Sequence, residues 1–305
     1  MQNRSKEVAD LALWSVDELK SALKENPNLI NEQDENGMTI LHYAAKIGFT
    51  LVSTSAREIL NELFNSQNLD FTIKNKSENT PLHLAALCCE DRVTCEFVFP
   101  AFVKEAARRG FDFSTLGQQG QSVLHIATRT SYTDARGIFG RINNVLNVLK
   151  NAANPGLDVI SSSGSTAFYY AVNFCHFAEA NALLDAGANP MLYGNKERDP
   201  LSMIDQHLQT FSQALLEIKS KDSHDCINAV IDELNELKKR VLEIAKMIRC
   251  DEIKKNASLL AQGTIFRQLP NQLIIKPEGD TRALDLHTQE EPEQILESDL
   301  QNPHL

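Results

Sequence analysis

Apolar residues recur at helical spacing in pairs of short segments along the first two thirds of the chain. In one of these segments, Leu82, Ala85 and Ala86 are spaced to face a neighbouring element, and the small alanines let helices approach closely. Three longer apolar stripes predict the second helices of the pairs. The stripes are Ile59, Leu60, Leu63 and Phe64 over residues 55–64; Val98, Phe99, Phe102, Val103 and Ala106, ending at Gly110; and Ile138, Ile142, Val145, Leu146 and Leu149.

One short string returns along the same region. Its fullest form is Thr80–Ala86, with clear copies at Thr39 and Ser122, a weaker copy at Thr166 and a degenerate one at Asp199. The string resembles the T-P-L-H-x-A signature of ankyrin repeats, and the resemblance covers roughly residues 10 to 210. It implies an all-α fold, an ankyrin-repeat solenoid of helix pairs with short finger loops.

The local chemistry of each copy agrees with this resemblance. Thr80 can cap a helix with its hydroxyl, and Pro81 then occupies the first helical position, where the missing N–H costs nothing. The resemblance implies that the histidine of each string bonds to the backbone and links adjacent repeats. We therefore interpret His42, His83 and His125 as structural residues rather than as zinc ligands.

The spacing of the copies departs from the family. Their first residues are separated by 41, 42, 44 and 33 positions, against a family repeat of about 33. The surplus must lie after the first helix, in the loop between the helices or in a longer second helix. Candidate segments are residues 48–53, 89–92 and 130–134. Insertions there would form a second interaction surface, whereas longer helices would only bury more core.

The two ends of the array differ from the repeats. Residues 7–30 predict two short helices without the string, typical of a capping repeat, the second with a capping box of Ser15 and Glu18 and an end at Pro27. We divide the chain into N-terminal capping helices at 1–33, about five repeats at 34–219 with the first three elongated, a heptad helix and cap at 220–268, and an acidic tail at 269–305.

A heptad follows the repeats. Its apolar positions are Ile227, Val230, Leu234, Leu237, Val241, Ile244 and Ile248. One interpretation is a self-associating coiled coil, which would make the protein a homodimeric scaffold. The other is a C-terminal cap that packs back on the last repeat, with residues 204–218 as a partner helix. We favour the cap, and with it a monomer, because the end of a solenoid must be covered.

The tail is acidic. Residues 281–305 hold one arginine against six carboxylates, a composition that favours a flexible segment. The glutamate cluster resembles the secretion signals of type IV effectors from intracellular bacteria, which include many ankyrin proteins. The resemblance implies a secreted effector that acts in the host cell cytosol and binds a host protein, although an inert acidic tail also fits these residues.

Composition narrows the function classes. The net charge of −11 argues against a nucleic-acid partner, which needs a basic stripe, and against an anionic membrane surface. The six cysteines have no paired spacing, which suggests reduced thiols in the cytoplasm. The polar start lacks the pattern of a signal peptide, and no apolar run is long enough to span a bilayer.

Catalytic motifs are scarce. We find no phosphate loop, zinc-protease motif, C-x-x-C pair or nucleophile elbow, and therefore expect no enzyme activity, no cofactor and no metal. The cluster at 224–226, His-Asp-Cys, contains cysteine-protease residue types, but the members of a triad meet through the fold and not along the chain. A C-terminal cysteine-type activity targeted by the repeats is the alternative.

The function that the resemblance implies is protein–protein recognition by the concave face, made of finger tips and first helices. The family's variable contact positions fall on polar residues for the most part, which predicts a hydrogen-bonding interface. They are Glu35, Met38, Lys46, Lys76, Asn79, Leu87, Gln118, Gln119, Gln121, Arg129, Asn173, Asn195, Lys196 and Glu197.

Overall fold

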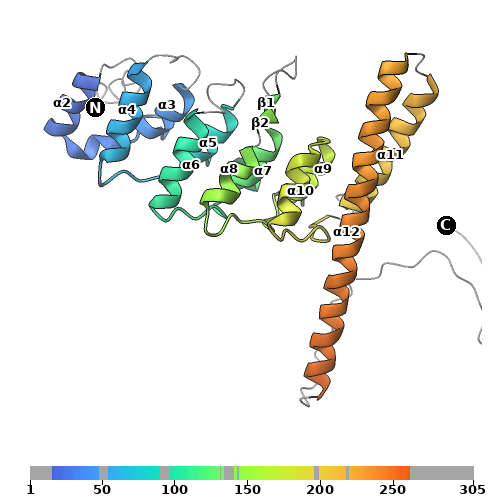
Figure 1. Cartoon of the computed structure of the whole chain (residues 1–305). Helices are drawn as coiled ribbons and strands as arrows, with labels where there is room; N and C mark the ends of the chain where they lie inside the picture. The colour runs from blue at the N-terminus through green and yellow to red at the C-terminus, as the bar shows by residue number, and fades with distance from the viewer. Residues whose placement is uncertain are drawn as a thin grey trace, which may run out of the picture. The chain divides into compact units, whose positions relative to one another are not determined.

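The computed structural model of the chain describes residues 16–47, 54–89, 97–130, 132–133, 141–142, 144–195, 199–217 and 220–261. It divides into two compact units, residues 1–254 and 255–305, and of the second unit only the end of the last helix is described. The described helices (Figure 1) are α2 Val16–Glu25, η2 Pro27–Asn31, α3 Ile40–Ile47, α4 Thr54–Asn65, α5 Pro81–Leu87, α6 Phe99–Arg108, η4 Gln118–Gly120, α7 Val123–Arg129, α8 Asn144–Asn151, α9 Ala167–Asn173, α10 Phe177–Asp185, α11 Pro200–Glu217 and α12 Lys221–Ala261.

The helices form two rows. The first helices of the pairs pack in chain order, α3 on α5, α5 on α7, α7 on α9 and α9 on α11 (Figure 1). In the second row, α6 packs on α8 and α8 on α10. The paired helices α3 to α10 are too short to be stable alone, so their stability comes from burying one face against the next pair.

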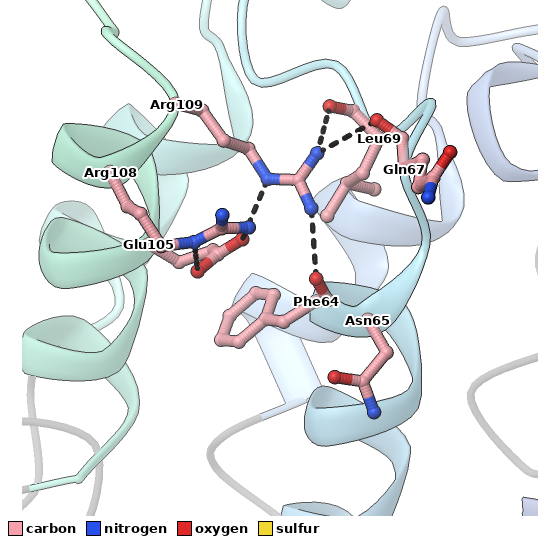
Figure 2. A pocket seen from close by; sticks show the side chains of 7 residues that line it. All are labelled: Phe64, Asn65, Gln67, Leu69, Glu105, Arg108 and Arg109. Carbon is pink, nitrogen blue, oxygen red and sulfur yellow. Dashed lines mark hydrogen bonds and ion pairs between the residues drawn. The ribbon is translucent and has the colours of Figure 1, made fainter.

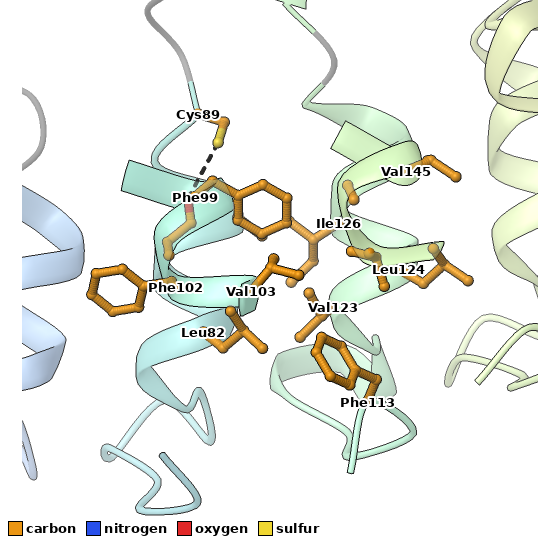
Figure 3. Close-up of a cluster of buried hydrophobic side chains, with 14 of the residues drawn as sticks. Leu82, Cys89, Phe99, Phe102, Val103, Phe113, Val123, Leu124, Ile126 and Val145 are labelled. Atoms are coloured by element: carbon orange, nitrogen blue, oxygen red, sulfur yellow. Dashed lines mark hydrogen bonds between the residues drawn. The ribbon is translucent and has the colours of Figure 1, made fainter. Parts of the chain in front are cut away.

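A continuous core lies between the rows. The predicted stripe of α6 is confirmed, because all five of its residues, from Val98 to Ala106, are buried. Figure 3 shows Phe99 and Phe102 of α6 among Leu82 of α5 and Leu124 of α7. The alanines of the strings, such as Ala85 and Ala86, are fully buried where first helices meet. Small side chains there permit the close approach that the sequence predicted.

The third repeat corrects one prediction. Ile142 does not belong to a second helix: it lies in strand β2 Arg141–Ile142, which pairs antiparallel with β1 Tyr132–Thr133. Helix α8 begins only at Asn144, whose side-chain Nδ2 donates to the carbonyl of Thr130 at 2.9 Å. Of the other predicted stripe residues, Val145 is buried and Leu146 is 36% exposed, and Ile138 lies outside the described residues.

In repeats two and three most of the surplus lies between the two helices, whereas in repeat one it is shared with a longer second helix, because α4 has twelve residues and α10 has nine. The connections span residues 48–53, 88–98 and 130–143 in repeats one to three, but only 174–176 in repeat four. Helix α8 has eight residues and α10 has nine, so a longer second helix does not account for the surplus of repeat three.

At the N-terminal end of the array, one of the two predicted helices is described. Helix α2 is the second of the two predicted N-terminal helices, whereas the first one and Ser15 lie outside the described residues. Pro27 does more than end α2, because it also begins the 3-10 helix η2.

Helix α12 packs on the last repeats. Leu234, Leu237 and Val241 from the middle of its heptad are fully buried and belong to the same core cluster as Ile204 of α11. Two ion pairs flank this contact, from Lys238 Nζ to Asp205 at 2.5 Å and from Arg240 Nη2 to Asp185 of α10 at 2.6 Å. The middle of the heptad is therefore covered by its own chain.

Candidate functional site

Three histidines fix the finger loops to the helices. His83 lies one turn inside α5, and its Nδ1 is 2.7 Å from the hydroxyl of the N-cap Thr80. Its Nε2 is 3.1 Å from the backbone carbonyl of Thr115, in the next finger. Because a carbonyl only accepts, Nε2 carries the proton. His42 and His125 make the same bridge, to the carbonyls of Asn79 and Ser165, both at 3.0 Å.

Burial keeps these histidines neutral. It lowers the pKa of His83 and of His125 to about 4, and it lowers the pKa of His42 as well. Both ring nitrogens of each histidine have protein partners. In the described part of the chain no group of three metal-binding side chains comes together. The structural interpretation of the three histidines thus agrees with their geometry.

The finger tips are also bonded to one another. The N–H of Lys76 donates to the carbonyl of Asn36 at 2.9 Å, and the N–H of Ser162 donates to the carbonyl of Gln119 at 3.0 Å. Between the second and third fingers, the N–H of Gln118 donates to Oδ1 of Asn79 at 3.0 Å. These bonds fix the register of successive tips and so the spacing of the side chains they carry.

We call the finger tips together with the outward side chains of α3, α5, α7 and α9 the finger face. It corresponds to the face that the sequence predicted to bind a partner. Seven predicted contact residues are exposed there: Glu35, Lys46, Lys76, Gln118, Gln119, Arg129 and Asn195. Leu87 and Asn173 are half-buried, and Lys196 and Glu197 lie outside the described residues.

Three predicted contact residues are buried and support the face from within. Met38, Asn79 and Gln121 are at most 9% exposed. Asn79 accepts the bond from Gln118 described above, and the sulfur of Met38 is 3.3 Å from Nδ2 of Asn75. Both residues lie in fingers, where a sequence suggests exposure, but their side chains instead contact neighbouring fingers.

One connected group of side chains crosses repeats three and four. Nη1 of Arg129 donates to Oε1 of Gln121 at 3.4 Å, and Nε2 of Gln121 is 3.3 Å from both Oε1 of Gln119 and the hydroxyl of Tyr170. The Tyr170 ring is stacked on Phe174, with centroids 6.3 Å apart and planes 11° apart. We call Gln119, Gln121, Arg129, Tyr170 and Phe174 the Arg129–Phe174 patch.

Sequence reasoning missed the aromatic part of this patch. It named Asn173 in repeat four, but the larger exposed side chain is Phe174, which is 44% exposed. The signal was available, since aromatic residues four positions apart on a helix lie on one side of it.

A second polar feature is a groove of about 740 Å³ between repeats one and two (Figure 2). All five guanidinium N–H donors of Arg109 are used there. Nε donates to Glu105, while Nη1 and Nη2 donate to four backbone carbonyls, those of Phe64, Ser66, Gln67 and Leu69, at 2.8 to 3.2 Å. Arg109 therefore caps the end of α4 and clamps it to α6, and it has no donor left for a ligand.

The predicted cysteine-type alternative gains no support from the structure. His224 and Cys226 both lie near the start of α12, two positions apart. Side chains at this spacing on a helix do not face each other. Cys175 Sγ is 3.8 Å from the nearest ring nitrogens of His207, but burial raises the pKa of this thiol and so disfavours the thiolate.

Comparison with known proteins agrees with the geometry. No protein-family model matches the chain. The chain matches the crystal structure of an ankyrin repeat protein with a TM-score of 0.50 and 20% sequence identity. The match covers 66% of this chain and 90% of the ankyrin repeat protein. The fold is an ankyrin-repeat solenoid. In the described residues, no helix is long and apolar enough to cross a membrane.

Curated relatives match over parts of their length. The chain is 26% identical over 148 residues to the nuclear factor NF-kappa-B p105 subunit of Rattus norvegicus and 27% identical over 187 residues to neurogenic locus notch homolog protein 1 of Danio rerio. It is 28% identical over 195 residues to NF-kappa-B inhibitor delta of Mus musculus. These matches cover 47%, 61% and 64% of this chain, but only 14%, 7% and 51% of the relatives.

Proposed function

We propose that the protein is a non-catalytic recognition module that binds another protein through the finger face. The observation that carries this proposal is the fixed register of the finger tips. The histidine bridges and the bonds between tips hold the exposed side chains in place before a partner arrives. A preorganised surface loses less conformational entropy on binding, so more of its contact energy appears as affinity.

The chemistry of the face suits a protein partner. The predicted contact residues exposed on it, such as Lys76, Gln118 and Arg129, are polar or charged hydrogen-bonding groups. The name of one relative describes an inhibitor of another protein, NF-kappa-B, which also favours a partner of this class.

Affinity capture from eukaryotic cell lysate, followed by titration of the identified partner, tests this function. We expect K76A/Q118A/R129A to weaken binding by about tenfold or more, because it truncates three exposed residues of the face. The matched control, K104A/K150A, truncates exposed lysines on the second helices α6 and α8 and should bind like the wild type. Equal binding by both variants would exclude the finger face as the site.

We also propose that the acidic tail carries an export signal, so that recognition takes place in a host cell. This rests on the glutamate-rich composition of residues 281–305 alone, which lie outside the described residues. A translocation reporter fused to the full chain should enter host cells, and the same fusion ending before residue 281 should not. Entry of both fusions would reject the signal.

A further inference from the structure

The part of the finger face in repeats three and four differs in charge from the rest. Residues 113–130 and 159–178 contain no aspartate or glutamate. The next acidic residue, Glu179, is buried in α10. The permanent charge in these two stretches is that of Arg129. The first two fingers, by contrast, carry both signs, with Glu35 and Glu78 beside Lys76.

Arg129 is held in position but keeps most of its bonding capacity. The hydrogen bond described above uses Nη1, and its acceptor Gln121 is only 5% exposed and bonded in turn to Gln119 and Tyr170. An arginine has five N–H donors in a planar fork that matches a carboxylate. No carboxylate ion pair to Arg129 occurs within the described residues.

An apolar surface adjoins this cation. Gln121 contacts Arg129 on one side and the Tyr170 hydroxyl on the other, so both are within the reach of one side chain. The half-buried Tyr170 ring is fixed further by the edge of His125, with centroids 5.7 Å apart at 81°. Phe174, stacked on it, presents an exposed ring. Arginine and aromatic residues are the types that dominate binding energy at protein interfaces.

We propose that the Arg129–Phe174 patch binds an extended segment of a partner protein that carries a carboxylate side chain next to an aromatic or aliphatic one. The carboxylate pairs with the Arg129 guanidinium, and the apolar side chain packs on the Phe174 ring. Side chains alternate between the two faces of an extended segment, so residues two positions apart, separated by about 6.6 Å, present both side chains to the same patch. The net negative charge of the whole chain does not prevent this, since charges beyond about 8 Å are largely screened at physiological salt.

This proposal rests on the proposed function and adds the partner's chemistry to it. The test is selection of random short peptides displayed on phage against the full chain, followed by fluorescence anisotropy with the selected peptides. We expect enrichment of Asp or Glu two positions from an apolar residue. R129Q, which removes the charge but keeps a polar side chain, should weaken binding of these peptides by about tenfold and should abolish the preference for Glu over Gln.

The matched control is K46Q. Lys46 occupies the position of repeat one that Arg129 occupies in repeat three, and it is also exposed. K46Q should bind the selected peptides like the wild type, while F174A should lose affinity for peptides with the apolar residue. Because Arg129 is a surface residue, R129Q keeps the test valid if F174A fails to fold.

The outcomes separate the two proposals. In one outcome, the selected peptides compete with each other and bind K76A/Q118A/R129A less tightly, but show no preference for a carboxylate. This outcome would overturn the acidic partner and leave the finger face as the binding site. Peptides that bind equally to that triple variant would overturn both. Failure to enrich any peptide, or equal loss in R129Q and K46Q, would overturn the acidic partner.

Discussion

The Nε2–H of His83 donates to the backbone carbonyl of Thr115, 3.1 Å away, and so ties the N-terminal end of one helix pair to the finger of the next. The neutral ring makes this bond while its Nδ1 is engaged with the Thr80 hydroxyl. A second proton on the ring requires the Thr80 hydroxyl to turn from donor to acceptor inside the core. The same is true of His125 with Ser122 and Ser165.

This relationship predicts acid-sensitive folding. The pKa of His83 and of His125 is about 4 in the folded protein, against 6.5 ordinarily, so the unfolded chain binds more protons between these values. Their contribution to stability is complete above pH 6.5 and is lost as pH falls toward 4, by about 3 kcal/mol for each histidine. Urea unfolding at several pH values measures this loss.

H125Q should have a shallower dependence of unfolding free energy on pH than the wild type. L124V, destabilised by a lost methylene rather than a lost titratable group, should keep the wild-type dependence. If both variants show the same slope, the buried histidines are not the cause of acid sensitivity.

The contacts of Arg109 predict that lysine substitutions at two adjacent arginines differ in their effect on stability. R109K should lower the free energy of unfolding by about 2 kcal/mol, because lysine cannot bond all four carbonyls at and just after the end of α4. R108K should change the free energy of unfolding much less, because the Arg108 side chain is 64% exposed and its partner among the described residues is Glu105. Urea titration of both variants checks this, and a similar loss in the two would contradict the clamp.

The backbone conformation of Glu78 predicts that its replacement by glycine stabilises the protein. Glu78 has φ 63°, in the left-handed region that glycine adopts freely, and the equivalent residue of the first finger is Gly37 with φ 73°. E78G should raise the free energy of unfolding by up to about 1 kcal/mol. The ion pair with Lys74, at 3.8 Å on the surface, is worth little. E78A should not stabilise, since alanine has the same strain, and a gain in E78A would refute the backbone explanation.

Local features were predictable, whereas contacts between repeats were not, apart from the histidine bridges that the family resemblance implied. The Thr80 cap, Pro81 and the stripe of α6 are set by neighbouring residues, so the sequence predicted them correctly. Ile142 was predicted to be helical because the apolar spacing around a single residue does not distinguish a strand from a helix. Its conformation is set by its pairing with Tyr132 in the neighbouring strand. The burial of Asn79 and the exposure of Phe174 likewise depend on residues more than thirty positions away or on the packing of the next repeat.

The heptad of α12 gives the last prediction. Leu237 is fully buried in the core cluster, whereas Met247, ten positions later on the same helix, is 59% exposed. L237A should therefore lower the free energy of unfolding by about 2–5 kcal/mol through loss of buried surface and creation of a cavity. M247A should change it by less than about 0.5 kcal/mol. Circular dichroism during urea unfolding measures both. Sedimentation of the same samples distinguishes the interpretations of the heptad: a cap predicts that L237A keeps the mass of the wild type, and a smaller mass for L237A at unchanged stability would mean that the heptad joins two chains.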